Sequence, residues 1–276
     1  LTKIRLYASR IKLPTQKIII DSKLLKIIIM KNNIQLKMKI LILLVLLIPF
    51  IGISQTKNVI STSRVFPKVD KVLEFEKALA THAQKYHTGD VKWRVFEIQS
   101  GPDAGGYHIV EGPKTWESED TRGDINVEHN KDWNKNVTIF LTDKHSSGYS
   151  VYIDSLSTIA IGDYSDKVQI THIFPKLGYG SNVLTVIKKL KAAWAAEGST
   201  IAVYEVNGSG KGQLAIARRY KQGLKEKEAG FRKSFKATYE KIHGVGSFAL
   251  YIDDIRQYYD DAWSEIIFYR ADLSSK

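Results

Sequence analysis

The chain of 276 residues contains no cysteine, only two methionines and six prolines. Without cysteine it can form no disulfide framework, no thiolate nucleophile, no Cys-ligated zinc or iron–sulfur centre and no lipidated N-terminal Cys. Hydrophobic residues make up 43% of the chain and charged residues 25%, which is the balance of a globular protein. These absences therefore exclude thiol-dependent, disulfide-stabilised and wholly disordered proteins.

A hydrophobic run long enough to span a bilayer takes about 20 residues, and the apolar run at 40–51 has only 12. It follows a basic start at Lys39 and precedes small residues at the minus-three and minus-one positions of a cut before Gln55. This order is typical of a secretory signal peptide, although a buried helix or a retained anchor has a similar pattern. We expect a bacterial signal peptide at 38–54 and a mature protein that is periplasmic or extracellular, with no stable membrane span.

The segment 1–37 is rich in Lys and Ile and has no amphipathic pattern delimited by turns. We interpret it as a spurious or untranslated N-terminal extension, with Met30 or Met38 as the true start. Residues 1–54 hold ten basic side chains and one acidic side chain, so the net charge falls from +12 for the whole chain to +3 beyond residue 54. Bulk charge therefore does not predict a nucleic-acid partner.

Short segments of the remaining chain recur at fixed spacing. V-F-P-K at 65–68 recurs as I-F-P-K at 173–176, and W-R-V-F-E-I at 93–98 recurs as I-A-V-Y-E-V at 201–206, both 108 residues later. V-Y-I-D at 151–154 matches L-Y-I-D at 250–253. The shared order predicts a duplicated unit, with one copy at 55–166 and the other at 167–276.

Each copy is predicted to run strand, helix, strand, strand, helix, strand, which is the ferredoxin-like or split βαβ unit. In the first copy we expect strands at 59–66, 92–98, 107–111 and 149–161, a helix at 70–86 capped by Asp70, and a helical or irregular region at 115–136. In the second copy we expect strands at 168–174, 200–206, 213–219 and 265–270, helices at 182–196 and 224–243, and a partly helical segment at 248–259. The strand at 168–174 either closes the first copy or opens the second, and we favour the second role.

The F-P-K strand ends, the two aromatic strands that lead into hairpins and the duplication resemble the dimeric α/β barrel group, which includes antibiotic-biosynthesis monooxygenase-like and NIPSNAP-like domains. The resemblance covers 59–273. It implies an α+β fold in which two antiparallel sheets from tandem ferredoxin-like units pack as a pseudo-dimeric α/β barrel around a small-ligand cleft. No residue set matches a catalytic signature of the group, so the resemblance implies a fold and a cleft rather than a reaction.

Strand alternation places Arg64 and His172 at equivalent positions, each on the face of apolar neighbours. Such residues could line the cleft, bind an anion or transfer a proton, while a solvated sheet edge is the alternative position. His108, on the expected hairpin strand, is a comparable candidate. We therefore expect these three side chains at the ligand cleft.

Glu97 and Glu205 are also equivalent, and each is flanked by apolar residues. A carboxylate in such surroundings can have a raised pKa and serve as an acid or base. The alternative is an ion pair with a neighbouring strand, for which Arg218 and Arg219 are available to Glu205. We add both glutamates to the candidate ligand cleft.

The sequence predicts no metal site and no cofactor. His82 and His87 would lie about 140° apart on one helix and so could not share a metal ion. The glycine-rich segment 207–213 lacks the spacing of a phosphate-binding loop and is predicted to be a hairpin loop.

The two copies differ in net charge, with −4 at 55–166 and +7 at 167–276. The basic excess could dock the copies or attract an anionic partner such as lipid A, or it could form a solvated helix face. We expect an exported monomer or homodimer that binds a small apolar or anionic ligand, with cofactor-independent oxidation as a candidate reaction. The alternative is a non-catalytic envelope or stress-related interaction scaffold.

Overall fold

The computed structural model describes residues 26, 30, 31, 33–35, 37–39, 56–207 and 210–276. The expected signal-peptide run at 40–54 and most of the N-terminal extension lie outside the described residues. The chain divides into two units, Leu1–Ser54 and Gln55–Lys276. In the first unit the described residues are helical and exposed. Over the described part of the chain, no helix combines the length and the apolar character needed to cross a membrane.

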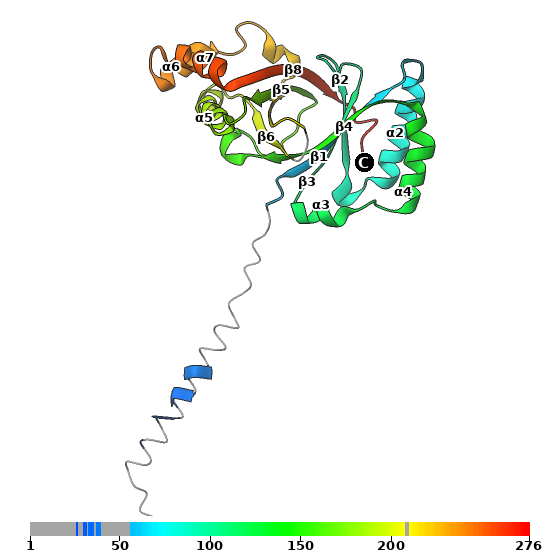
Figure 1. Cartoon of the computed structure of the whole chain (residues 1–276), viewed down its shortest axis with the longest axis horizontal. Coiled ribbons are helices and arrows are strands. Elements are labelled where there is room, and N and C mark those ends of the chain that lie inside the picture. The colour runs from blue at the N-terminus through cyan, green and yellow to red at the C-terminus, as the bar shows by residue number, and fades with distance from the viewer. Residues whose placement is uncertain (1–25, 27–29, 32, 36, 40–55, 208–209) are drawn as a thin grey trace, which may run out of the picture. The chain divides into compact units, whose positions relative to one another are not determined.

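The second unit contains eight antiparallel strands that close into one barrel, in the order β1-β3-β2-β8-β5-β7-β6-β4 (Figure 1). Closure pairs both sides of every strand, so the barrel has no free sheet edge. The strands are β1 (Val59–Pro67), β2 (Trp93–Ile98), β3 (Tyr107–Lys114), β4 (Leu141–Tyr152), β5 (Lys167–Pro175), β6 (Ile201–Asn207), β7 (Gln213–Tyr220) and β8 (Tyr259–Tyr269).

Helices cover the barrel on two sides (Figure 1). On one side lie α2 (Val72–Tyr86), α3 (Trp116–Arg122) and α4 (Val127–Asp132), and on the other lie α5 (Gly180–Ala196), α6 (Phe235–His243) and α7 (Ser247–Tyr258). In α2 the buried residues Phe75, Leu79 and Ala83 recur every four positions, so one face of the helix packs on the sheet. Short helical turns occur at 69–71, 89–91, 133–137, 138–140, 154–156 and 223–227.

Three apolar clusters stabilise this arrangement. One packs α2 on the first strands through Phe75 and Val65, a second packs α5 and α6 on the later strands, and a third fills part of the barrel interior. Because successive side chains of a strand point to opposite faces, each strand serves an outer cluster and the interior at once. In β1, Val65 packs toward α2 while Arg64 points into the barrel.

The α+β class and the order of elements in each half agree with the sequence expectation. Each half runs β-α-β-β-α-β, and its strands lie in the order β4-β1-β3-β2 or β8-β5-β7-β6. The strand β5 pairs with β7 and β8, so it opens the second half. The halves form one continuous barrel rather than two separate sheets, because β2 pairs with β8 and β4 pairs with β6.

Several expected bounds were wrong. The charged helix predicted at 224–243 is a short turn at 223–227 followed by α6, because Gly230 interrupts it with a φ of 86°. The strand expected at 149–161 ends at Tyr152 and extends back to Leu141 through exposed polar residues. The last strand begins at Tyr259 rather than Glu265. Asp70 lies in the turn at 69–71 and does not cap α2, whose N-cap residue is Lys71.

Candidate ligand site inside the barrel

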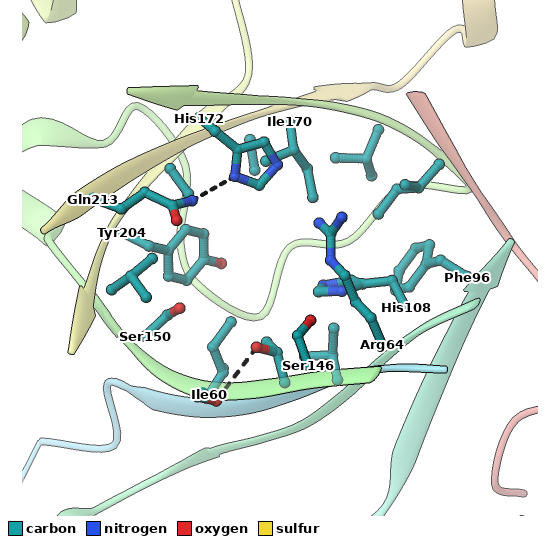
Figure 2. A pocket seen from close by; sticks show the side chains of 18 of the residues that line it. Ile60, Arg64, Phe96, His108, Ser146, Ser150, Ile170, His172, Tyr204 and Gln213 are labelled. Carbon is teal, nitrogen blue, oxygen red and sulfur yellow. Dashed lines mark hydrogen bonds between the residues drawn. The ribbon is translucent and has the colours of Figure 1, made fainter. Parts of the chain in front are cut away.

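A cavity of about 290 Å³ lies inside the barrel. Figure 2 shows its labelled side chains projecting from strands on all sides toward a common space. Its volume matches the smaller end of ligand pockets, which hold about 300–1,000 Å³. Much of the wall is apolar and is formed by Ile60, Phe96, Val110, Val168, Ile170 and Ile267.

One buried carboxylate links the two halves of the barrel beside this cavity. Glu265 of β8 is 1% exposed. Its Oε2 accepts a hydrogen bond from Nη1 of Arg64 at 3.0 Å, its Oε1 also pairs with Nη2 of Arg64, and Oε1 lies 2.8 Å from Nε2 of His172. Burial alone would raise the pKa of Glu265, but the hydrogen bond from His172 and the cation of Arg64 together lower it below its ordinary value. Glu265 is therefore ionised at neutral pH.

The hydrogen bonds of His172 define its tautomer. Nε2 donates to the Glu265 carboxylate, so Nδ1 carries a lone pair, and that nitrogen accepts from the side-chain amide of Gln213 (Figure 2). The imidazole ring stacks on Trp263 with ring centroids 4.0 Å apart. His172 is thus held by three neighbours, and its basic nitrogen lies at the cavity wall.

The hairpin loop 99–106 supplies an acidic partner to Arg64. Asp103 accepts a hydrogen bond from Nη1 of Arg64 at 2.6 Å and one from Nζ of Lys144 at 2.8 Å. Gly101 lies against β8 with a φ of 95°, and a Cβ there would be 3.0 Å from Cβ of Glu265. The loop therefore packs against the strand that carries Glu265. The two carboxylates and two cations balance in charge, so this end of the cavity is polar but close to neutral.

His108 of β3 lies beside Arg64 and faces the same cavity (Figure 2). It is buried, and its Nδ1 has no hydrogen-bond partner among the described residues. Burial, with a further effect of the Arg64 cation, lowers the pKa of His108 to about 3. The ring is therefore neutral at pH 7 and offers a polar atom that a ligand could satisfy.

A second polar group lines another part of the wall. Arg219 of β7 donates to the hydroxyl of Tyr204 at 2.7 Å and to backbone carbonyls in the segment 160–163. Its guanidinium also lies 4.8 Å from the ring centroid of Tyr164. Burial raises the pKa of Tyr204 to about 12, so the phenol stays protonated. Because Arg219 is already bound by carbonyl groups, it serves mainly to hold this side of the cavity together.

The opening of the cavity follows from small residues in β4. In the register of the barrel, Arg64 faces Ser146 and Thr62 faces Gly148, whereas the equivalent residues of the second half, His172 and Ile170, face Trp263 and Glu265. Ser146, Ser147 and Gly148 all line the cavity, and both serines are exposed. Small side chains thus leave a mouth in one half where bulky side chains fill the other.

Three of the five side chains predicted for the ligand cleft line the cavity, namely Arg64, His108 and His172. Glu97 and Glu205 do not, and their predicted place in the cleft was wrong. Glu97 pairs on the outer face with Arg270 at 3.1 Å, and Glu205 is exposed. Both glutamates follow an inward-facing aromatic residue, Phe96 or Tyr204, and strand alternation therefore turns them outward.

Sequence reasoning missed Glu265, Asp103 and Gln213. Glu265 was treated as the first residue of its strand because the polar run before it hid four strand residues. Asp103 and Gln213 lie at hairpin ends, where the sequence shows only glycine-rich turns. The argument that His82 and His87 are separated on one helix was also wrong, because α2 ends at Tyr86.

No family model matches the sequence, and no curated protein matches it. Among solved structures, a protein provisionally described as a monooxygenase from Lactobacillus acidophilus NCFM is similar at 10% identity and a TM-score of 0.48, over 79% of this chain and 95% of that chain. An anthrone oxidase-like protein is similar at 11% identity and 0.49, over 78% and 92%. A mutant chlorite dismutase from Candidatus Nitrospira defluvii is similar at 9% identity and 0.45, over 79% and 93%. Identities and TM-scores this low do not place the chain in a family.

Proposed function

We propose that the protein binds a small, largely apolar molecule that carries a hydroxyl group, inside the barrel. The observation that carries the proposal is the Glu265–His172 pair at the wall of an otherwise largely apolar cavity. The apolar wall accounts for most of the ligand surface, while Nδ1 of His172 accepts the hydroxyl proton in place of the Gln213 amide. The near-neutral balance of the Arg64 group favours a neutral hydroxyl compound over a permanent anion.

The same geometry supports proton transfer. Glu265 fixes the tautomer of His172 and stabilises its cation, so Nδ1 can act as a general base toward a phenol or enol. Arg64, which lies on the other side of Glu265, would stabilise the anion that forms. Cofactor-independent oxidation would begin with this step: the electron-rich anion would donate electrons to dioxygen, which is the oxidant and is reduced.

We also propose that the barrel arose by duplication of one ferredoxin-like unit and that the chain is exported. Equivalent placement of Arg64 and His172 and the repeated strand order support the first proposal. The signal-peptide pattern supports the second, and β1 begins at Val59, a few residues after the expected cut before Gln55. N-terminal sequencing of the exported protein tests this cut, and a mature chain that starts far from Gln55 would contradict it.

Binding is tested with 2-naphthol, an apolar bicyclic phenol, and with naphthalene, which lacks the hydroxyl group. We expect the wild-type protein to bind 2-naphthol more tightly than naphthalene in a fluorescence titration. His172→Gln should remove that preference, by about tenfold in Kd for one lost hydrogen bond to a strong acceptor. His145→Gln, at an exposed histidine of β4, is the matched control. Equal binding of both probes by the wild type would overturn the proposal.

An oxygen electrode separates binding from catalysis with the same probe. Oxygen consumption by the wild type that is lost in His172→Gln supports the oxidation step. Binding without oxygen consumption restricts the function to that of a ligand-binding protein.

A further inference from the structure

Three histidines meet outside the barrel, at the side covered by α2 and α4. His82 lies on α2, His87 is the residue that ends α2, and His129 lies on α4, which runs beside α2 (Figure 1). One ring nitrogen from each histidine lies within 4.8 Å of the others. His82 and His87 are fully buried, and His129 is partly buried. None of the three lines the cavity in the barrel.

Each of these rings has an oxygen acceptor at Nδ1. His82 Nδ1 lies 2.8 Å from the carboxylate of Asp132, and His87 Nδ1 lies 3.1 Å from the carbonyl oxygen of Val91. His129 Nδ1 lies 3.0 Å from the side-chain oxygen of Asn130. Since carboxylate and carbonyl oxygens only accept, the hydrogen sits on Nδ1. The three Nε2 atoms are left with lone pairs.

These lone pairs are directed into one small space. Nε2 of His87 and Nε2 of His129 are 3.2 Å apart, and Nε2 of His82 is buried without a hydrogen-bond partner among the described residues. Two acceptors at that distance repel unless a proton or a cation lies between them. If the Asn130 amide were reversed, His129 could donate from Nε2 to His87. The buried Nε2 of His82 would still have no partner.

A metal ion would satisfy all three nitrogen atoms together. Zinc binds histidine nitrogen at about 2.0–2.1 Å, so two ligands in a tetrahedral site are about 3.3 Å apart. The observed 3.2 Å between His87 and His129 matches this spacing. Burial lowers the pKa of His82 to about 4 and lowers that of His87, so both rings are neutral at pH 7 and ready to bind a metal.

The residues behind the rings have the arrangement that metal-bound histidines require. In such sites the second ring nitrogen donates to a carboxylate or carbonyl, which fixes the ring and increases its basicity. Asp132 fills this role for His82 and is itself held by Asn136 at 2.8 Å. His87 stacks on Trp93 with ring centroids 3.4 Å apart, so this ring cannot rotate freely.

We propose that His82, His87 and His129 form a binding site for a divalent transition metal ion, with zinc as the best fit. Three neutral imidazoles suit zinc, copper, nickel and cobalt rather than magnesium or calcium, which prefer oxygen ligands. Three protein ligands leave one position for water or a further ligand. The bound ion ties the end of α2 to α4, so it stabilises the outer helices independently of any ligand in the barrel.

Calorimetry on EDTA-treated and desalted protein tests the site with zinc alone. We expect one Zn²⁺ per chain, and Co²⁺ should give the visible absorption of a tetrahedral site. His129→Gln should abolish this stoichiometric binding, and Asp132→Asn should weaken it about 10- to 100-fold. His145→Gln, far from the cluster in sequence and exposed, should leave it unchanged.

A thermal melt separates loss of a ligand from loss of folding. Zinc should raise the Tm of the wild type and of His145→Gln but not that of His129→Gln. If His129→Gln fails to fold, the graded loss in Asp132→Asn carries the test. No stoichiometric zinc binding by the wild type, or binding that both cluster variants leave unchanged, would overturn the proposal.

Discussion

Arg64 and His172, which are 108 residues apart in the sequence, bind the same carboxylate from opposite sides. They occupy equivalent positions in β1 and β5, and Glu265 of β8 joins them. The barrel interior thus combines side chains from both halves, and neither half alone carries the group. This shared contact couples the stability of the barrel to the chemistry of its cavity.

Replacing Glu265 tests that coupling. Glu265→Gln leaves the buried Arg64 guanidinium without its bidentate partner, and we expect the free energy of unfolding to fall by about 3 kcal/mol. Urea denaturation measures the change. Glu205→Gln, at an exposed position of β6, should stay within about 0.5 kcal/mol of the wild type. Equal effects of the two substitutions would contradict a structural role for the buried pair.

Gly101 and Gly105 form a matched pair in the loop 99–106, since both have positive φ angles, 95° and 86°. A Cβ at Gly105 would meet nothing within 4 Å, whereas one at Gly101 would press on Glu265. Both alanine variants should lose about 1 kcal/mol from backbone strain. Gly101→Ala should lose about 1–3 kcal/mol more from overpacking. The same loss in both variants, measured by thermal or urea unfolding, would rule out the contact with β8.

His108 makes stability depend on pH. Its folded-state pKa of about 3 lies below the ordinary value of 6.5, so from pH 6.5 down to 3 the unfolded state binds a proton that the folded state does not. Its contribution to stability is complete above pH 6.5 and is lost, by about 1.4 kcal/mol per pH unit, as the pH falls.

The charged and titratable groups that act on His108 are Arg64, Glu265, His172 and Asp103. Between pH 6.5 and 5 the two carboxylates stay ionised, so His108 can be isolated. The difference in unfolding free energy between the wild type and His108→Asn should shrink across this window by urea denaturation. A constant difference would mean that His108 titrates normally.

The mouth of the cavity should respond to the size of residue 146. Ser146→Trp copies the second half of the barrel, where Trp263 occupies the equivalent position. We expect 2-naphthol to associate about tenfold more slowly, a barrier increase of about 1.4 kcal/mol. Asp143→Trp, elsewhere on the exposed part of β4, is the control for stopped-flow fluorescence. Unchanged association in Ser146→Trp would place the mouth elsewhere.

The sequence predicted the elements better than their contacts. Period-two and period-four patterns around Arg64 and Phe75 mark β1 and α2, because burial on one face constrains those residues directly. Glu265 could not be predicted as the partner of Arg64, since a pairing across 201 residues depends on barrel closure. The histidine cluster depends on where α2 ends, and a change of one residue there moves His87 from the helix surface to the interior.

The most direct measurement of the central claim is 2-naphthol binding to a variant whose cavity is filled. Ala215 of β7 lines the cavity, and Ala215→Phe would occupy the space that the ligand needs. Ala195→Phe, on the exposed surface of α5, adds the same side chain outside the barrel. With folding checked by circular dichroism, titration should show binding to the wild type and Ala195→Phe and none to Ala215→Phe. Undiminished binding to a folded Ala215→Phe variant would contradict a ligand site inside the barrel.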